Sequence, residues 1–214
     1  MNKISVFILG AGGHSKVLID SLRFKEHIQI LGVLDIDPQL MGKKILGVNV
    51  LGSEHEILKQ YLPHSVQLVN GIGSVGPTVG REQIFQKFKS FGYSFLTIIH
   101  PTAYVGQEVI LGEGVQLMAG SIVQPGSEIG DNVIINTNAS VDHDSFIGNH
   151  VHLAPGVICC GSVKIDSGTH AGCGVVIRQG VHIGKNSFIA AGAVVVKDIN
   201  VGSKVAGVPA KSME

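Results

Sequence analysis

The feature of this chain that most restricts its fold is a repeat of six residues in its second half. Stepping by six from Val105 to Val195, sixteen consecutive positions carry an apolar residue, with no break in the frame. These positions are Val105, Leu111, Leu117, Val123, Ile129, Ile135, Val141, Ile147, Leu153, Cys159, Ile165, Ala171, Ile177, Ile183, Ile189 and Val195. Four residues after each of the first fifteen lies a small or β-branched residue. A β-sandwich would instead place turns about every 8–12 residues, in a variable frame.

A period of six has a simple physical interpretation. Each hexad is one short strand plus one corner, and three hexads make a triangular coil of eighteen residues. The apolar residue and the small residue both point into the prism, and stacked coils pair their backbones about 4.8 Å apart. Gly or Asn favours the corners, because a positive φ costs these residues little. Glycine also recurs one place after the apolar residue, at Gly106, Gly112, Gly130, Gly148, Gly172 and Gly184. The pattern predicts a parallel β-helix over residues 101–198.

Residues 1–100 follow a different rule, in which apolar strands alternate with helical patterns. We expect strands at 4–9, 30–34 and 66–71, and a second helix at 82–91. The first helix follows the glycines of 10–13, with Val17, Leu18, Leu22 and also Ile19 on its buried face. Strand–helix–strand order with apolar strands predicts a small parallel, Rossmann-like α/β domain. Residues 199–214 form a separate C-terminal tail.

Charge and cysteine content narrow the classes of function and the compartment. Lys+Arg and Asp+Glu are 16 each, so the chain lacks the basic footprint of a nucleic-acid-binding protein. The three cysteines, Cys159, Cys160 and Cys173, form no spaced disulfide framework, which is typical of a reducing compartment. No apolar run approaches the ~20 residues that span a bilayer. We therefore expect a cytoplasmic protein with neither nucleic acid nor membrane as a partner.

Four motifs, taken in order, resemble the bacterial hexapeptide-repeat acyltransferases that acetylate nucleotide-linked aminosugars or sialic acids. They are Gly-Ala-Gly-Gly-His-Ser-Lys-Val at 10–17, Ile-His-Pro-Thr-Ala at 99–103, Asn-Thr at 136–137 with Val-Asp-His-Asp at 141–144, and Gly-Val-Pro-Ala-Lys at 207–211. The resemblance covers nearly the whole chain. It implies a left-handed coil, acetyl-CoA as acyl donor, and a homotrimer with active sites between neighbouring prisms.

His143 is the candidate catalytic base. It lies two places after the inward Val141, so its ring should point outward, and the carboxylate of Asp144 would orient it and raise its basicity. One coil further, at 143 plus 18, stands Gly161. Its open backbone would admit a thioester, and its N–H would polarise the thioester carbonyl, as relatives use a glycine amide. The plainer alternatives are a surface histidine beside an acid and a glycine that only shapes a turn.

The resemblance also implies a binding site for acetyl-CoA. His152 matches a histidine that relatives keep near the thioester, and the site extends to Gly192. The tail with Pro209 and Lys211 would cover the adenine end of CoA, with the lysine near a phosphate. Structural or solvent-exposed roles for these residues stay open.

Several histidines lie close together in the sequence, which raises the question of a metal site. His152 and His170 are eighteen residues apart and would form a vertical pair on one face. No Cys, His or Asp cluster has zinc-ligand spacing, so we expect no metal.

The glycine loop that opens the first helix is the candidate acceptor site. Backbone N–H groups at Gly10, Gly12 and Gly13 would face phosphates, although Ser15 replaces the third glycine of a dinucleotide motif. The resemblance implies that this loop and the end of the second strand hold the nucleotide. Asp35 and Asp37 would then bind the base or ribose, and His14 the diphosphate or sugar. A tight turn and helix capping are the alternatives.

Together these features predict an acetyl-CoA-dependent N-acetyltransferase. It would act by direct transfer on the amino group of a UDP- or GDP-linked amino-deoxysugar, as in the biosynthesis of surface glycans such as O-antigen. Two alternatives remain: O-acetylation of a sialic-acid-type sugar, and a sugar-binding scaffold with no activity.

Overall fold

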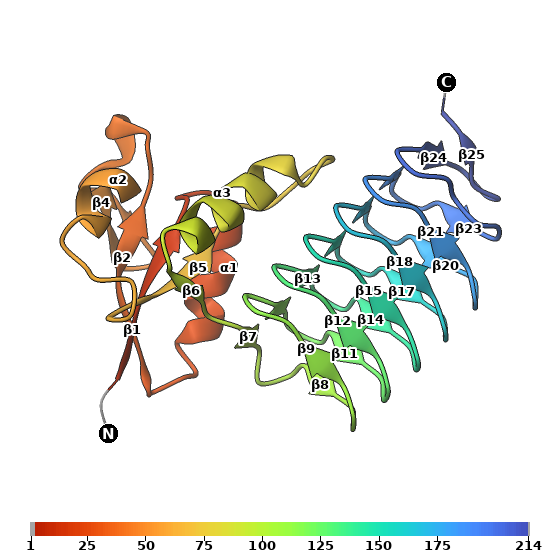
Figure 1. Cartoon of the computed structure of the whole chain (residues 1–214), viewed down its shortest axis with the longest axis horizontal. Helices are drawn as coiled ribbons and strands as arrows, with labels where there is room; N and C mark the ends of the chain where they lie inside the picture. The colour runs from red at the N-terminus through yellow and green to blue at the C-terminus, as the bar shows by residue number, and fades with distance from the viewer. Residues whose placement is uncertain (1–2, 214) are drawn as a thin grey trace.

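A computed structural model describes residues 3–213 of the chain, which form an α/β domain followed by a β-helix (Figure 1). In the α/β domain, one sheet has the strand order β3-β4-β2-β1-β5-β6 and is parallel except for the β3–β4 hairpin. Its elements are β1 (Ile4–Leu9), α1 (Gly13–Leu22), β2 (Ile28–Leu34), the 3₁₀ helix Pro38–Leu40, β3 (Lys44–Ile45), β4 (Val48–Gly52), α2 (Glu54–Leu58), β5 (Gln67–Asn70), α3 (Val79–Ser90) and β6 (Ser94–Phe95). The hairpin and α2 were not predicted.

Alternation along β1 gives this domain two cores, because successive side chains of a strand point to opposite faces. Val6 and Ile8 pack toward α1, whereas Phe7 and Leu9 pack in the cluster that contains residues of α3. The expected buried face of α1 is confirmed for Leu18, Ile19 and Leu22 but is wrong for its first member. Val17 is 41 % exposed, because α1 turns that side toward solvent.

The rest of the chain winds into a prism whose three faces are parallel sheets. We call them the first face (β7 to β25), the second face (β8 to β23) and the third face (β9 to β21). Each is built from every third strand, except at the end of the first face, where β24 follows β22 and β25 pairs with β24 in antiparallel fashion. The strands are β7 (Ile98–Ile99), β8 (Tyr104–Val105), β9 (Ile110–Leu111), β10 (Gln116–Leu117), β11 (Ile122–Val123), β12 (Glu128–Ile129), β13 (Ile134–Ile135), β14 (Ser140–Val141), β15 (Phe146–Ile147), β16 (His152–Leu153), β17 (Ile158–Cys159), β18 (Lys164–Ile165), β19 (His170–Ala171), β20 (Val176–Ile177), β21 (His182–Ile183), β22 (Phe188–Ile189), β23 (Val194–Val195), β24 (Lys204–Ala206) and β25 (Lys211–Ser212).

The predicted period holds from β7 to β23, whereas β24 pairs with β22 at an offset of sixteen, as in Phe188–Lys204. Strands pair with an offset of eighteen residues, as in the register Val123–Val141–Cys159 on the second face. The apolar hexad residues and their small partners form one continuous core along the axis. The sequence-based expectation of an α/β domain followed by a left-handed parallel β-helix is confirmed. The first face continues beyond residues 101–198 at both ends, through β7 and through β24 and β25.

At the corners, the residues with positive φ are not the glycines that directly follow the apolar residues. The residue with positive φ lies three places after the apolar residue, as at Gly114, Asn132 and Asp144. The glycines one place after the apolar residue do not have positive φ and serve close approach instead. A Cβ on Gly112 would lie 2.7 Å from the Asp131 nitrogen in the next coil, so only glycine fits between the coils there.

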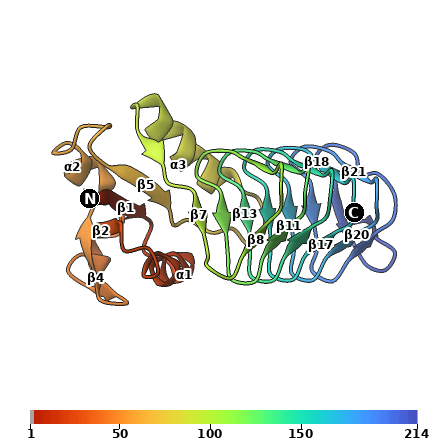
Figure 2. The same ribbon diagram turned by 90° about the horizontal axis from the view of Figure 1, so that it is seen from below.

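The α/β domain packs on the early coils, and the C-terminus lies at the far end of the prism (Figure 2). Ile98, Met118 and Ile134 of the β-helix join the α1-side core and are 0 % exposed. The two regions therefore share one apolar interface. In the described residues no helix has the length and apolarity needed to cross a membrane.

Candidate active site

His143 stands on the corner between the second and third faces, just after β14. Its Nδ1 lies 2.8 Å from Oδ2 of Asp144, and half of its side chain is exposed. The hydrogen bond to Asp144 is the main cause that raises the pKa of His143 above its usual value. Asp144 has φ +56, and this left-handed turn of the chain accompanies its contact with the preceding imidazole. The pair predicted from the sequence is thus formed within one corner.

Neighbouring coils hold this corner in place. The Ser162 N–H donates to the His143 carbonyl, and the Asp144 N–H donates to the Pro125 carbonyl, at 2.8 and 3.1 Å. Since Nδ1 is engaged by the carboxylate, Nε2 is the ring nitrogen left for a substrate proton.

Gly161 lies directly against this ring, as the spacing of eighteen predicted. A Cβ on Gly161 would come within 2.6 Å of Nε2 of His143, so the imidazole occupies the space that any other side chain would need. The other fifteen hexads carry a residue with a Cβ at this place, two after the apolar position. The glycine is therefore required by contact with His143, since its φ is not positive.

A pocket of about 690 Å³ forms between the glycine loop and the first face of the prism. Gly10, Gly12 and Gly13 line it, and α1 begins there without any side chain capping its N-terminus. From the prism, Asn136, Thr137 and His152 line it as well. The free N–H groups of a first helical turn make such a place suited to an anion.

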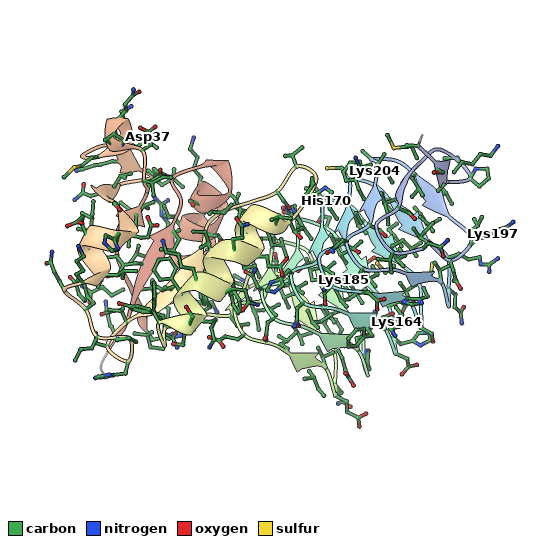
Figure 3. All side chains as sticks on the ribbon, turned by 45° about the horizontal axis from the view of Figure 1, so that its top comes forward. Asp37, Lys164, His170, Lys185, Lys197 and Lys204 are labelled. Carbon is green, nitrogen blue, oxygen red and sulfur yellow. The ribbon has the colours of Figure 1, made fainter. Side chains whose placement is uncertain are left out.

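The two predicted aspartates have different roles in the structure. Asp35 lines the pocket, and its carboxylate accepts hydrogen bonds from the N–H groups of Ala11 at 2.6 Å and Asp37 at 2.9 Å. Asp37 is not among the lining residues; it accepts from the Gln39 N–H as a cap and lies at the outer tip of the domain (Figure 3). Asp35 thus shapes the glycine loop, whereas Asp37 stabilises a turn.

His14 lines the same pocket, and its ring forms a hydrogen bond with a side chain of the prism. Its Nε2 lies 2.7 Å from Oε1 of Gln116, a buried residue of β10. Burial is the main cause that lowers the pKa of His14 to about 4, with the charge of Arg81 as a second cause. His14 is therefore neutral at physiological pH.

His152 and His170 form the vertical pair predicted on the first face. Their ring centroids are 5.0 Å apart, and Ser74 Oγ lies 2.7 Å from Nδ1 of His152 and 3.4 Å from Nδ1 of His170. Burial is the main cause that lowers the pKa of His152 to about 2. Asn136 Nδ2 lies 3.1 Å from the other nitrogen of His152. Both ring nitrogens of His152 are thus engaged by the protein.

Apart from His152, which lines the glycine-loop pocket on the first face, the predicted CoA residues lie near two corners of one chain. Gly161 stands with His143 between the second and third faces, whereas Gly192 stands between the first and second faces, next to the tail. The Val194 N–H donates to the Gly207 carbonyl at 3.0 Å, and Pro209 and Lys211 are exposed. Neither His143 nor Gly161 lines the glycine-loop pocket. A single chain therefore separates the predicted base from the predicted nucleotide site.

Sequence reasoning missed Ser74, Gln116 and Arg81, which hold the pocket together. Gln116 had a signal: it lies on the outward column of the first face, 36 residues before His152 in the same register. Ser74 and Arg81 had none, because their contacts come from the packing of the α/β domain. Within residues 3–213, no group of three metal-ligating side chains gathers in metal-binding geometry.

Family models match both regions of the chain. Residues 5–88 match the PglD N-terminal domain, and residues 108–143 match the bacterial transferase hexapeptide repeat. GDP-perosamine N-acetyltransferase of Escherichia coli is 29 % identical over 167 residues, which is 78 % of this chain and 73 % of that protein.

Solved structures are similar over the full length. PerB of Caulobacter crescentus, crystallised with CoA and GDP-perosamine, is 37 % identical with a TM-score of 0.89, covering 98 % of this chain and 97 % of that one. The acetyltransferase domain of PglB from Neisseria gonorrhoeae is 33 % identical with a TM-score of 0.88, covering 98 % and 99 %. Variants of the Caulobacter enzyme with one histidine replaced by asparagine or alanine also exist as complexes with CoA and GDP-perosamine.

Proposed function

Because this chain belongs to the bacterial hexapeptide-repeat acetyltransferases of nucleotide-linked aminosugars, we propose that it transfers the acetyl group of acetyl-CoA to the amine of a UDP- or GDP-linked amino-deoxysugar. The observation that carries this proposal is the His143–Asp144 pair set against Gly161. The imidazole of His143 is exposed, the Asp144 carboxylate binds its Nδ1, and the backbone of Gly161 lies beside its Nε2. A histidine in this setting is suited to act as the general base in direct acyl transfer.

The reaction needs no covalent enzyme intermediate. The sugar amine attacks the thioester carbonyl, a C–N bond forms and the C–S bond breaks. Nε2 of His143 takes the proton that the amine loses and returns it to the leaving thiolate, which departs as CoA thiol. Asp144 holds the ring through Nδ1 and stabilises its charged form. The Gly161 N–H is our candidate donor to the developing oxyanion.

The pocket beside α1 is the candidate nucleotide site. Its uncapped helix N-terminus and glycine loop suit a diphosphate, with Gly10, Gly12 and Gly13 as its contacts. Asp35 supports this site through the loop. The neutral His14 is suited to accept a hydrogen bond from a ligand hydroxyl or amine rather than to neutralise phosphate charge.

A second copy of the chain would unite the separated parts. On the second face, three residues of the outward column are apolar and exposed, with Ser140 between the last two: Tyr104 at 53 %, Ile122 at 37 % and Ile158 at 45 %. Covering this column with a neighbouring prism would bring the corner of His143 and Gly161 toward the corner of Gly192 and the tail of Pro209 and Lys211. The proposed assembly is a homotrimer with acetyl-CoA held between prisms, and His152 positioned through Asn136. We propose that the protein acts in the cytoplasm and that acetyl transfer requires no metal ion.

The experiment is an acetyl-transfer assay with one acceptor class at a time. With acetyl-CoA in excess, we expect release of CoA thiol with a UDP- or GDP-linked aminosugar and unchanged rates in the presence of a chelator. Turnover of free sialic acid without turnover of any nucleotide aminosugar would instead identify an O-acetyltransferase. No CoA release with either class would contradict the proposal and favour a scaffold. Light scattering tests the trimer.

A further inference from the structure

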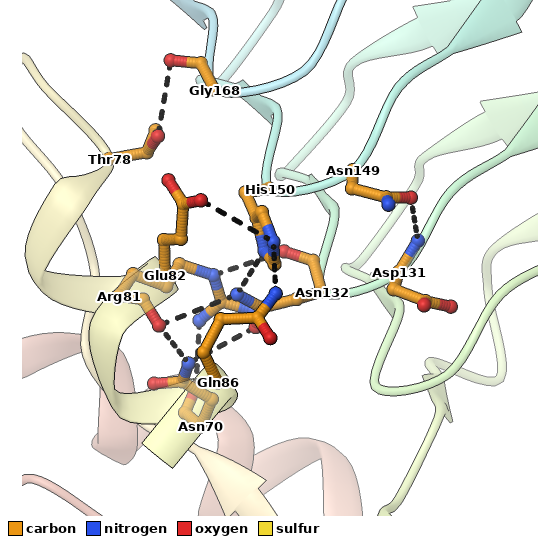
Figure 4. A network of polar contacts seen from close by, with 10 residues as sticks. All are labelled: Asn70, Thr78, Arg81, Glu82, Gln86, Asp131, Asn132, Asn149, His150 and Gly168. Atoms are coloured by element: carbon orange, nitrogen blue, oxygen red, sulfur yellow. Dashed lines mark hydrogen bonds and ion pairs between the residues drawn. The ribbon is translucent and has the colours of Figure 1, made fainter. Parts of the chain in front are cut away.

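Arg81, in the first turn of α3, is 1 % exposed, and its guanidinium donates only to backbone carbonyl oxygens. Its Nη1 donates to the carbonyls of Asn70 and Ile72, both at 2.9 Å. Its Nε donates to the carbonyl of Asn132 at 3.3 Å, and Figure 4 shows the contacts with Asn70 and Asn132. Nη2 has no hydrogen-bond partner within residues 3–213. Arg81 thus links the α/β domain to the prism, and one nitrogen of its buried guanidinium has no hydrogen bond among the described residues.

The charge of Arg81 is also uncompensated. The adjacent carboxylate, Glu82, faces His150 at 3.9 Å, and in the described part of the chain no Asp or Glu pairs with Arg81. Burial lowers the pKa of Arg81 to about 9, which still leaves a cation at neutral pH. Because a cation in the first turn of a helix opposes the helix dipole, this placement gains nothing from α3. An isolated buried charge is costly, so an anion bound nearby would offset its cost.

The glycine-loop pocket is the candidate place for such an anion. The two carbonyls that Nη1 of Arg81 binds, those of Asn70 and Ile72, flank Gly71, and Gly71 and Ile72 line that pocket. Thr78, the residue before α3, bonds to the Gly168 carbonyl at 3.1 Å and anchors the helix to the prism. The positive charge therefore lies behind the wall of the pocket, held rigidly from both regions.

The lining of the pocket itself supplies no cation. Gln116 Nε2 donates to the Asn70 carbonyl at 2.8 Å, so its Oε1 must accept from Nε2–H of His14. Nδ1 of His14 is then an unprotonated acceptor. The charge of Arg81 contributes to the lowered pKa of both His14 and His152, so its field reaches both sides of the pocket.

We propose that Arg81 is a buried counter-charge for the diphosphate of the nucleotide-linked sugar, acting through the pocket wall from behind the Asn70–Ile72 backbone and without touching the ligand. This inference rests on the proposed function, since it concerns the same pocket. It assigns the attraction for phosphate charge to a residue that does not line the site, and it leaves His14 free to contact the sugar.

The test compares Arg81→Met with the unaltered protein by calorimetric binding of four ligands: GDP, UDP, guanosine and uridine. We expect the variant to bind the better diphosphate on the order of tenfold more weakly, because one charge interaction is lost. The matching nucleoside carries no phosphate and should bind within about twofold of the unaltered protein. Arg23→Met, on the exposed end of α1, is the matched control and should leave both affinities unchanged.

Binding of the nucleoside distinguishes loss of the Arg81 charge from a change in the shape of the pocket. Equal weakening of the diphosphate and its nucleoside would mean that Arg81 only shapes the wall, and unchanged affinity for both would mean that its charge is not felt; either result overturns the inference. If Arg81→Met melts too low for calorimetry, Arg81→Gln removes the charge but keeps two N–H donors for the carbonyls. An unaltered protein that binds none of the four ligands would contradict the proposed nucleotide site instead.

Discussion

The β-helix and the α/β domain bring residues together by different rules. In the β-helix a residue's neighbours lie eighteen places away in either direction, so His143 and Gly161 meet by register alone. In the α/β domain neighbours depend on how helices pack on the sheet, and Arg81 reaches Asn70 and Asn132 only through the placement of α3. A repetitive scaffold fixes a reacting pair from local sequence, whereas ligand recognition here depends on irregular connections.

This contrast implies that the two regions have different functions. Substitutions at the corner of the β-helix should change the rate of transfer, and those in the α/β domain should change acceptor binding.

His143→Ala should lower kcat by about 10²–10⁴-fold, because the general base is lost. Its melting temperature should stay near that of the unaltered protein, since the ring is half exposed. His182→Ala is the matched control: His182 also pairs with a carboxylate, Asp166, at 2.8 Å on another coil. If kcat falls less than tenfold for His143→Ala, or falls equally for His182→Ala, the corner of His143 is not the catalytic centre.

Ile165→Ala should lower the free energy of unfolding by about 2–5 kcal/mol, because it opens a cavity in the axial core. Ile165 is 0 % exposed, whereas Ile110, on the same face, is 62 % exposed. Ile110→Ala should therefore cost far less in the same denaturant titration. Similar costs for the two variants would show that the hexad position does not decide burial.

Gly161→Ala should reduce kcat by roughly 10–100-fold while leaving acceptor KM nearly unchanged, because the new methyl displaces the imidazole it would meet at 2.6 Å. Ser167→Ala, at the same place in the next hexad, is the control and should be neutral. A normal rate for Gly161→Ala would mean that the contact with His143 has no part in catalysis.

Asp35→Asn should raise acceptor KM about tenfold, because an amide cannot accept both backbone hydrogen bonds that now hold the glycine loop. The KM for acetyl-CoA should not move. Asp20→Asn, on the exposed side of α1, is the comparison variant. If acetyl-CoA KM rises instead, the α/β domain does not have the separate role proposed for it.

Asp144→Asn should move the acid limb of the kcat–pH profile to lower pH, as well as reduce the plateau. Asp144 raises the pKa of His143, and a base works only when neutral, so activity falls as pH drops through that pKa. Removing the carboxylate lowers the pKa toward its ordinary value and shifts the fall with it. Asp142→Asn, which removes a weaker cause of the same shift, should move the limb less. A limb that stays in place would assign the titration to another group.

The sequence alone determined the β-helix, its core and the meeting of His143 with Gly161, because a period of six leaves one way to bury an unbroken apolar row. It also predicted the strands and helices that surround the glycine loop. It failed at Val17, where a helix face is set by what packs against it. It also did not show that the six glycines directly after apolar hexad residues serve close packing between coils.

Only the tertiary structure decided how the pocket is assembled. Ser74, Gln116 and Arg81 come from three separate segments, and their hydrogen bonds between the two regions exist because the α/β domain rests on the prism. The structure also places the glycine loop against the first face of the prism, away from the corner that carries His143. Period and spacing carry information along a repeating backbone, whereas the docking of one region on another depends on the summed shape and polarity of two surfaces, which no local pattern encodes.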